Sequence, residues 1–207
     1  MLTDVFAYVI LKAMQYKKQF IHDRLLEEGM AEFLEKGFRQ GSITAISERA
    51  GVPIGNLYRY FDGKNGLLDA LVKNTYEEFP KLIDKLSWAD KEITMIDIAM
   101  LMGHLTQLLL NVFGQYGKTM ILLVDKCATT RYEDFLDKII DQVANIVHAK
   151  FYESIKTDLD RLMSKIASRA FVTSIFDVLR MQLDEDKTKE ILLRIMNFYF
   201  CSLETRL

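Results

Sequence analysis

The chain has 207 residues, of which 50% are hydrophobic, so it can bury a sizeable core in one large domain or two small ones. Two distant cysteines, Cys127 and Cys201, suggest neither a disulfide framework nor a metal site, and they favour the reducing cytoplasm. A net charge of −2 excludes a general attraction to polyanions, so any binding of nucleic acid must depend on a local patch.

Residues 1–17 form an apolar N-terminal extension. Asp4 stands where a secretory signal would carry positive charge, and the stretch is too short and too interrupted to cross a bilayer. We therefore expect no membrane association and an extra helix docked on the body of the protein. Met14 is an alternative translation start, and the sequence does not decide between Met1 and Met14.

A first packing helix is expected from about 18 to 36. Leu26, Met30 and Phe33 form an apolar stripe near helical spacing. Gly37 can supply the left-handed residue that ends a helix.

Two shorter helices should follow in helix-turn-helix order. Ser42 is a suitable N-cap for a helix that reaches Ala50, and Gly51 would close it. Pro53 fits a first helical position, where its missing N–H costs nothing, and starts a third helix that reaches Tyr60.

The third helix is the candidate for reading DNA. Arginine pairs two-pronged with guanine and asparagine with adenine, so Arg59 and Asn56 are suited to base edges, whereas Tyr58 and Lys64 are suited to phosphates. Eight basic residues face seven acidic ones between Lys17 and Lys64, so charge alone does not indicate DNA. The alternative is a plain helical hairpin with a solvated Arg59 and Asn56.

Residues 18–72 resemble the DNA-binding domain of the TetR family of bacterial transcriptional regulators. The resemblance is carried by Gly37-Phe38, the Ile46 and Ala50-Gly51-Val52 segment, Gly55-x-Leu57-Tyr58-x-Tyr60-Phe61, Lys64 and Leu67-Leu68. It implies that DNA is contacted by Ile54, Gly55, Asn56, Tyr58, Arg59, Tyr60 and Lys64, with Ser42 and Thr44 approaching the backbone or an adjacent base.

The chain departs from the family pattern at four positions. Pro53 and Ile54 replace a serine cap and a lysine at the start of the third helix, although Ile54 can contact a thymine methyl. Gly29 and Gly66 lie where a helix former is usual, and each should cost about 0.5–1 kcal/mol relative to alanine. We expect modest DNA affinity with strong salt dependence.

The remainder reads as helix throughout. A fourth helix should run from about Lys64 past Tyr76, end or kink at Pro80, and precede a turn at 87–90. Further helices are expected over 91–113, 116–127, 131–154, 158–182 and 185–206, with caps at Asp90, Thr130, Thr157 and Asp184, of which Thr130–Glu133 and Thr157–Asp160 fit the reciprocal capping box.

A ligand pocket is expected against the helix over 91–113, which is apolar nearly all round and should be central. Met100, His104, Gln107 and Asn111 fall on one face at spacings of three and four. Polar groups converging in apolar surroundings are typical of a ligand site. They are equally consistent with a core histidine and amides satisfied by neighbouring helices.

The last two helices, about 158–206, carry wide apolar faces. A single chain could bury one of them, but a two-fold partner would bury both in a four-helix bundle, as the TetR resemblance also implies. Two recognition helices about 34–36 Å apart would then match successive major grooves.

Together these features predict an all-α protein with a helix-turn-helix domain at 18–72 and a helical ligand-binding and dimerisation domain at 73–207. The expected function is that of a cytoplasmic homodimeric transcriptional regulator, a repressor released from a double-stranded DNA operator by an unidentified small molecule. No catalytic motif or cofactor fingerprint is present, so neither an enzyme nor a cofactor is expected. The alternative is a helical ligand-binding or protein-interaction module that has lost specific DNA binding.

Overall fold

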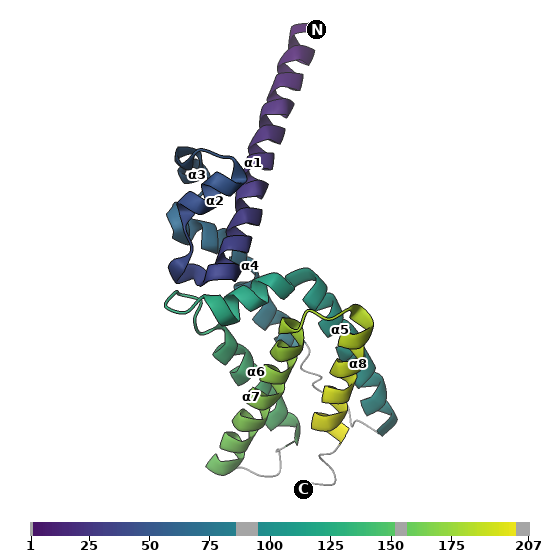
Figure 1. Ribbon diagram of the computed structural model, residues 1–207. Coiled ribbons are helices and arrows are strands. Elements are labelled where there is room, and N and C mark those ends of the chain that lie inside the picture. Colours follow the sequence, from purple (N-terminus) through teal and green to yellow (C-terminus); the bar gives the residue numbers. More distant parts are fainter. Residues whose placement is uncertain (1, 86–94, 152–156, 202–207) are drawn as a thin grey trace.

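The computed structural model in Figure 1 describes residues 2–85, 95–151 and 157–201, and the side chains of 11–84, 102–148 and 157–199. Within these ranges all regular structure is helical, which confirms the expected all-α class. The elements are α1 (Leu2–Gln40), α2 (Ile43–Ala50), α3 (Ile54–Tyr60), α4 (Gly63–Lys85), α5 (Met95–Ile121), the π-helix η1 (Leu122–Lys126), α6 (Phe135–Phe151), α7 (Asp158–Arg180), α8 (Glu185–Met196) and the π-helix η2 (Asn197–Cys201).

Helix α1 is longer than predicted. It begins at Leu2 and projects past α2 and α3 in Figure 1, and Leu11 and Tyr16 are 65% and 77% exposed. The expected docking of the extension on the body is therefore wrong. Gly37 has a positive φ of 76°, but its ψ of 162° is extended and not left-handed helical, so Gly37 kinks α1 and does not form the predicted left-handed stop, and a short helical stretch continues to Gln40.

Helices α2 and α3 follow the sequence prediction closely. The Ser42 hydroxyl accepts a hydrogen bond from the Ala45 N–H, and Gly51 ends α2 with a φ of 64°. Pro53 is the N-cap of α3 with extended backbone, one position earlier than predicted. The N–H of an N-cap residue takes no part in the hydrogen bonds of the helix, so the missing N–H of Pro53 costs α3 no hydrogen bond.

Helix α4 passes through Pro80 and continues to Lys85, so of the end or kink that was predicted at Pro80, the end is wrong. Contacts with α6 support the segment after the proline, since Gln142 Nε2 donates to the Pro80 carbonyl at 3.2 Å and to Asp84 Oδ1 at 3.0 Å. The expected turn at 87–90 and the cap at Asp90 lie outside the described residues.

Helix α5 is continuous where a break was predicted between residues 113 and 116. Gly114 and Gly117 are both accommodated within it, and Gly117 lies close against Leu179 of α7. The cost of a glycine in a helix is about 1 kcal/mol, which the burial of one helix face easily exceeds. The chain then widens into η1, which buries Leu122 and Leu123.

The start of α6 also differs from the prediction. Thr130 and Glu133 do not form a reciprocal cap, because the Tyr132 N–H binds Thr130 Oγ1 while Glu133 accepts from the Thr129 N–H instead. Helix α6 starts at Phe135, after a turn in which Thr129 has a φ of 66°.

The caps of the last two helices are as predicted. Thr157 and Asp160 form the full capping box of α7, and the Asp184 carboxylate accepts from the Lys187 N–H at the start of α8. Helix α7 ends at Arg180 and η2 extends α8 to Cys201, whereas the predicted helical residues 91–94, 152–154 and 202–206 lie outside the described part.

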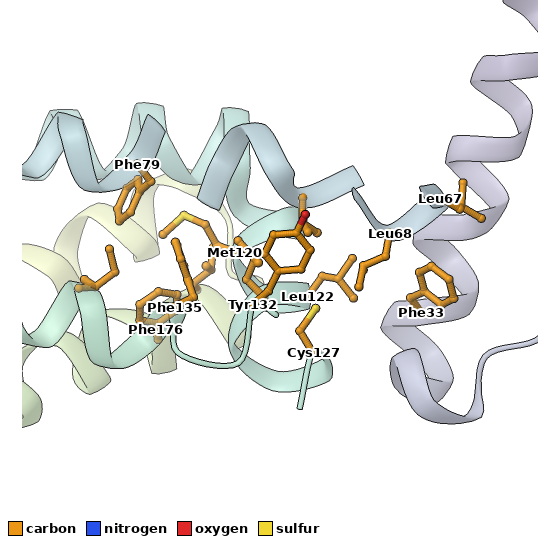
Figure 2. Close-up of a cluster of buried hydrophobic side chains, with 14 of the residues drawn as sticks. Phe33, Leu67, Leu68, Phe79, Met120, Leu122, Cys127, Tyr132, Phe135 and Phe176 are labelled. Atoms are coloured by element: carbon orange, nitrogen blue, oxygen red, sulfur yellow. The ribbon is translucent and has the colours of Figure 1, made fainter. Parts of the chain in front are cut away.

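One hydrophobic core connects the N-terminal and C-terminal halves. Figure 2 shows Phe33 of α1 and Leu67 and Leu68 of α4 in a cluster that continues to Leu122 and Cys127 at the end of η1. The expected domain boundary at 72 falls inside α4, which contributes to the core on both sides of it. Motion of one half is therefore mechanically coupled to the other.

Candidate DNA-binding surface

The outer face of α3 is exposed along its length. Ile54 is 44% and Tyr58 59% exposed, Gly55 and Arg59 are also exposed, and Asn56 is half-buried. Arg59 makes no hydrogen bond or ion pair with any described residue. Its guanidinium is therefore available to a partner outside the chain.

The opposite face of α3 fixes its orientation. Leu57 is fully buried and Phe61 is 6% exposed, and both belong to the main core. Tyr60 is half-buried, with its ring 6.2 Å from the His22 ring of α1, so the predicted DNA contact at Tyr60 is also a packing position. The helix-turn-helix domain expected at 18–72, called the head from here on, therefore presents α3 as a rigid element held by α1.

A buried carboxylate joins α1 to the start of α2. Glu32 is fully buried, and it accepts from the Ser42 N–H at 2.9 Å, from Arg49 Nη1 at 2.8 Å and from Lys36 Nζ at 3.2 Å. Burial alone would raise the pKa of Glu32, but the hydrogen bonds from Ser42, Arg49 and Lys36 outweigh it and hold the pKa below its usual value.

This network also determines which cationic side chains of the head are available to bind DNA. Arg49 is bound by Glu32 and, at 3.0 Å, by Glu28, so the positive charge of Arg49 is neutralised within the head. The Ser42 side chain is occupied in capping α2, whereas Thr44 on the same helix is exposed. Among the predicted contact residues of α2, Thr44 has the more accessible side chain.

Lys64 opens α4 in a partly buried position. Its Nζ donates to the Arg39 carbonyl at 3.1 Å and lies 4.8 Å from the centre of the Phe38 ring. Burial lowers the pKa of Lys64, while the charge of Glu32 acts in the opposite direction. In the ligand-free chain the Lys64 ammonium is thus satisfied by the end of α1, and it must share or exchange that contact to reach a phosphate.

The predicted ligand-binding face of α5 points to solvent. His104, Gln107 and Asn111 are all exposed, and Gln107 Nε2 donates to Asn111 Oδ1 at 3.4 Å. The expected enclosure of these three side chains is wrong for the single chain, because α5 turns its opposite side, with Met102 and Thr106, into the core. The Met100 side chain lies outside the described ones, and the role of the set in ligand binding stays a prediction.

The apolar faces of the last two helices have different surroundings. On α7 a stripe of four large side chains is at least half exposed, comprising Leu159, Leu162, Met163 and Ile166. On α8, by contrast, Leu192 and Met196 are buried against α5 and α7 within the same chain. The single chain therefore covers one of the two apolar faces, that of α8, and leaves the stripe on α7 exposed, while the burial of both faces by a second copy stays a prediction.

Two negative findings apply to the described part of the chain. No helix there is both long enough and apolar enough for a membrane span. Nor does any group of three His, Cys, Asp or Glu side chains there come together as metal ligands.

The fold and this surface define an all-helical protein with an N-terminal helix-turn-helix head. Residues 25–71 match the family of bacterial regulatory proteins called tetR. The match lies within the helix-turn-helix head and leaves the helices that follow residue 71 unassigned.

Two curated relatives agree with that assignment. The probable HTH-type transcriptional regulator YttP of Bacillus subtilis is 34% identical over 62 residues, 30% of each chain. The HTH-type transcriptional regulator BetI of Yersinia pestis is 44% identical over 50 residues, which are 24% of this chain and 25% of BetI. The similarity thus covers less than a third of either relative.

Solved structures of similar fold cover nearly the whole chain. The MbdR regulator from Azoarcus sp. CIB has a TM-score of 0.63 at 17% identity, covering 85% of this chain and 96% of MbdR. NalD, the secondary repressor of the MexAB-OprM multidrug efflux pump in Pseudomonas aeruginosa, has a TM-score of 0.54 at 21% identity, covering 89% and 97%. At these identities the likeness establishes the fold alone.

Sequence reasoning missed the residues that organise the head. Glu32 and Arg49 lie 17 positions apart, and no local pattern connects them; the only local signal is Lys36, four residues after Glu32 on the same helix. No local pattern predicts the groove between α1, α5, α7 and α8, because the residues that line the groove come from three distant parts of the chain.

Proposed function

We propose that the protein is a ligand-responsive transcriptional regulator, a repressor that a small molecule releases from its DNA operator. The observation that carries this proposal is the exposed face of α3, where Arg59 projects without an internal partner from a helix anchored by Leu57 and Phe61. A helix presented in this way fits the major groove, and arginine is the commonest side chain to pair with guanine there.

The similar solved structures support the ligand-responsive part of the proposal. NalD and SmeT are repressors of multidrug efflux pumps, SmeT has been solved with triclosan, and FadR from Bacillus subtilis with stearoyl-CoA. These are properties of those proteins. They make an apolar small molecule a reasonable class of effector for a chain of this fold.

A homodimer is part of the same proposal. The stripe of Leu159, Leu162, Met163 and Ile166 on α7 is a contiguous apolar surface that the chain leaves in water. Burying it against the same stripe of a second copy gives the two-fold arrangement that a near-palindromic operator requires. Ligand binding would then act by shifting the pair between states with different spacings of the two heads.

The test is a selection of bound sequences from random duplex DNA at two salt concentrations, with the native chain and with Arg59→Ala. The native chain should enrich a near-palindromic site, with affinity that falls steeply as salt rises. Arg59→Ala should weaken binding to that site by about 1–3 kcal/mol and relax one base position.

The control for Arg59→Ala is Arg194→Ala, which removes an exposed arginine of α8 that is paired with Glu190. It should leave the enriched site and the affinity unchanged. An unchanged footprint with Arg59→Ala would exclude Arg59 from the recognition surface. No enrichment by the native chain even at low salt would favour the alternative, a helical module without specific DNA binding. The nearly equal numbers of basic and acidic residues in the head are the observation that motivates this alternative.

A further inference from the structure

A groove of about 810 Å³ lies where the head meets the C-terminal half. Its lining includes Leu34 of α1, Phe113 and Ile121 of α5, Val178 of α7, and Leu183 just after α7. This volume falls within the range of roughly 300–1,000 Å³ that small-molecule sites occupy. The groove is thus large enough for a ligand and touches both halves of the molecule.

The groove is separate from the face that sequence reasoning assigned to a ligand. Of His104, Gln107 and Asn111, only Asn111 lines it. It also differs from the interior between α4 and α6, where Phe79, Met120 and Phe135 fill the core, as Figure 2 shows. A molecule can therefore enter this groove without displacing those buried side chains.

The groove lining carries one cation, Lys118, and one carboxylate, Glu185, and it is the cation that can bind an acidic group. Lys118 of α5 is exposed, and its ammonium forms no ion pair with the described residues. The side-chain amides of Asn111 and Gln182 add two further donors. Glu185, the carboxylate in the lining, belongs to the first turn of α8, where the helix dipole stabilises its negative charge.

We propose that this groove binds a small apolar molecule that carries a carboxylic acid, with its hydrocarbon part along Leu34 and Phe113 and its carboxylate on Lys118. The inference rests on the proposed function only in making this molecule the effector. Because Leu34 belongs to α1, a bound molecule contacts the head directly and stabilises one orientation of the head relative to α5 and α7.

Two glycines of α5 provide a matched test. Gly114 lines the groove and Gly103 does not, and a Cβ added at either position meets no atom within 4 Å. Gly114→Leu therefore places an apolar side chain at the groove wall, with a Cβ that meets no neighbouring atom within 4 Å. Gly103→Leu makes the same chemical change on the same helix, away from the groove.

Decanoate and decanol are the probes, titrated separately by calorimetry below their aggregation concentrations. The native chain should bind decanoate about tenfold more tightly than decanol, because a charge-assisted contact with Lys118 is worth about that factor. Lys118→Gln should abolish the preference and retain the decanol affinity. Gly114→Leu should lose both probes, whereas Gly103→Leu should bind them as the native chain does.

Two outcomes would overturn the site. One is native affinity of Gly114→Leu for decanoate, and the other is a native chain that binds neither probe. The titration contains no DNA, so its failure leaves the proposed function intact, and a failed DNA selection leaves the groove intact. Release of the selected DNA site by decanoate from the native chain, but not from Gly114→Leu, would support the regulatory part.

Discussion

At the scale of single residues, Glu32 is the side chain on which the head depends most. Its carboxylate is fully buried and accepts hydrogen bonds from the backbone N–H of Ser42, the N-cap of α2, and from the cations Lys36 and Arg49. Removing one partner of such a buried set leaves the others unsatisfied, which costs far more than the set contributes as a whole. Glu32 is therefore a structural requirement for the position of α2, although it cannot itself reach DNA.

Glu32→Gln should lower the free energy of unfolding by about 2 kcal/mol at neutral pH, since an amide keeps one acceptor but loses the charge that pairs with Arg49 and Lys36. The lowered pKa of Glu32 also means that the unfolded chain takes up its proton first as the pH falls. The contribution of Glu32 to stability is thus complete above its ordinary carboxyl pKa, begins to be lost below that value, and is fully lost only below the lowered pKa of the folded state.

Urea denaturation at pH 7 and at pH 4 measures both effects. The native chain should lose stability between these two values, and Glu32→Gln should lose less of it. Glu35→Gln, at an exposed position of the same helix, is the control and should behave like the native chain. Equal stability of the two variants at pH 7 would contradict the role of Glu32.

At the scale of elements, the contact between α1 and α4 depends on Gly29, a residue that was expected from the sequence to destabilise α1. A Cβ at Gly29 would lie 2.9 Å from Leu67 Cδ2, and Leu67 is fully buried. The glycine therefore allows the two helices to approach each other, and its propensity cost is offset by that packing. Gly66 is similarly restricted, with Asp62 Cβ at 3.1 Å from the added atom.

Gly29→Ala and Gly103→Ala should change stability in opposite directions. Alanine at position 29 overpacks against Leu67 and should destabilise the protein by about 1–3 kcal/mol. Alanine at position 103 meets open space and should stabilise the protein by about 0.5–1 kcal/mol. Thermal unfolding of the two variants beside the native chain measures both signs, and a stabilised Gly29→Ala would show that α4 can yield.

The elements also show how far the sequence could be followed. Ser42, Gly51 and Thr157 were identified because capping is local, with donor and acceptor three to five residues apart. The continuity of α5 through Gly114, and of α4 through Pro80, depends on contacts with other helices, which no local pattern contains. The groove is the extreme case, since Leu34, Phe113 and Val178 meet only after folding.

At the scale of the whole molecule, the proposed dimer depends on the exposed stripe on α7. Leu159 is 66% exposed and Ile166 54%, on a helix whose other side packs on the chain's own core. A second copy is the partner that the proposed function requires there. Pairing through this stripe would fix the distance between the two copies of α3.

Leu162→Glu should convert the protein to a monomer, because two carboxylates would face each other across the two-fold axis in an apolar interface. Light scattering after gel filtration measures the mass, and titration of the selected DNA site measures the lost affinity. Leu11→Glu, an equally exposed apolar position on α1, should remain dimeric. A dimeric Leu162→Glu would place the interface elsewhere.

The long helix α1 extends far beyond the other helices of the head. From the kink at Gly37 to Leu2 the helix spans roughly 50 Å at 1.5 Å per residue, with Gly37 resting against Lys126 at the end of η1. With Gly37 as the pivot, a rotation of the head by about 10° would carry Tyr16 through about 5 Å. The same rotation displaces Tyr16, which is 77% exposed, somewhat further than His22, where α3 packs on α1, because Tyr16 lies further from the pivot.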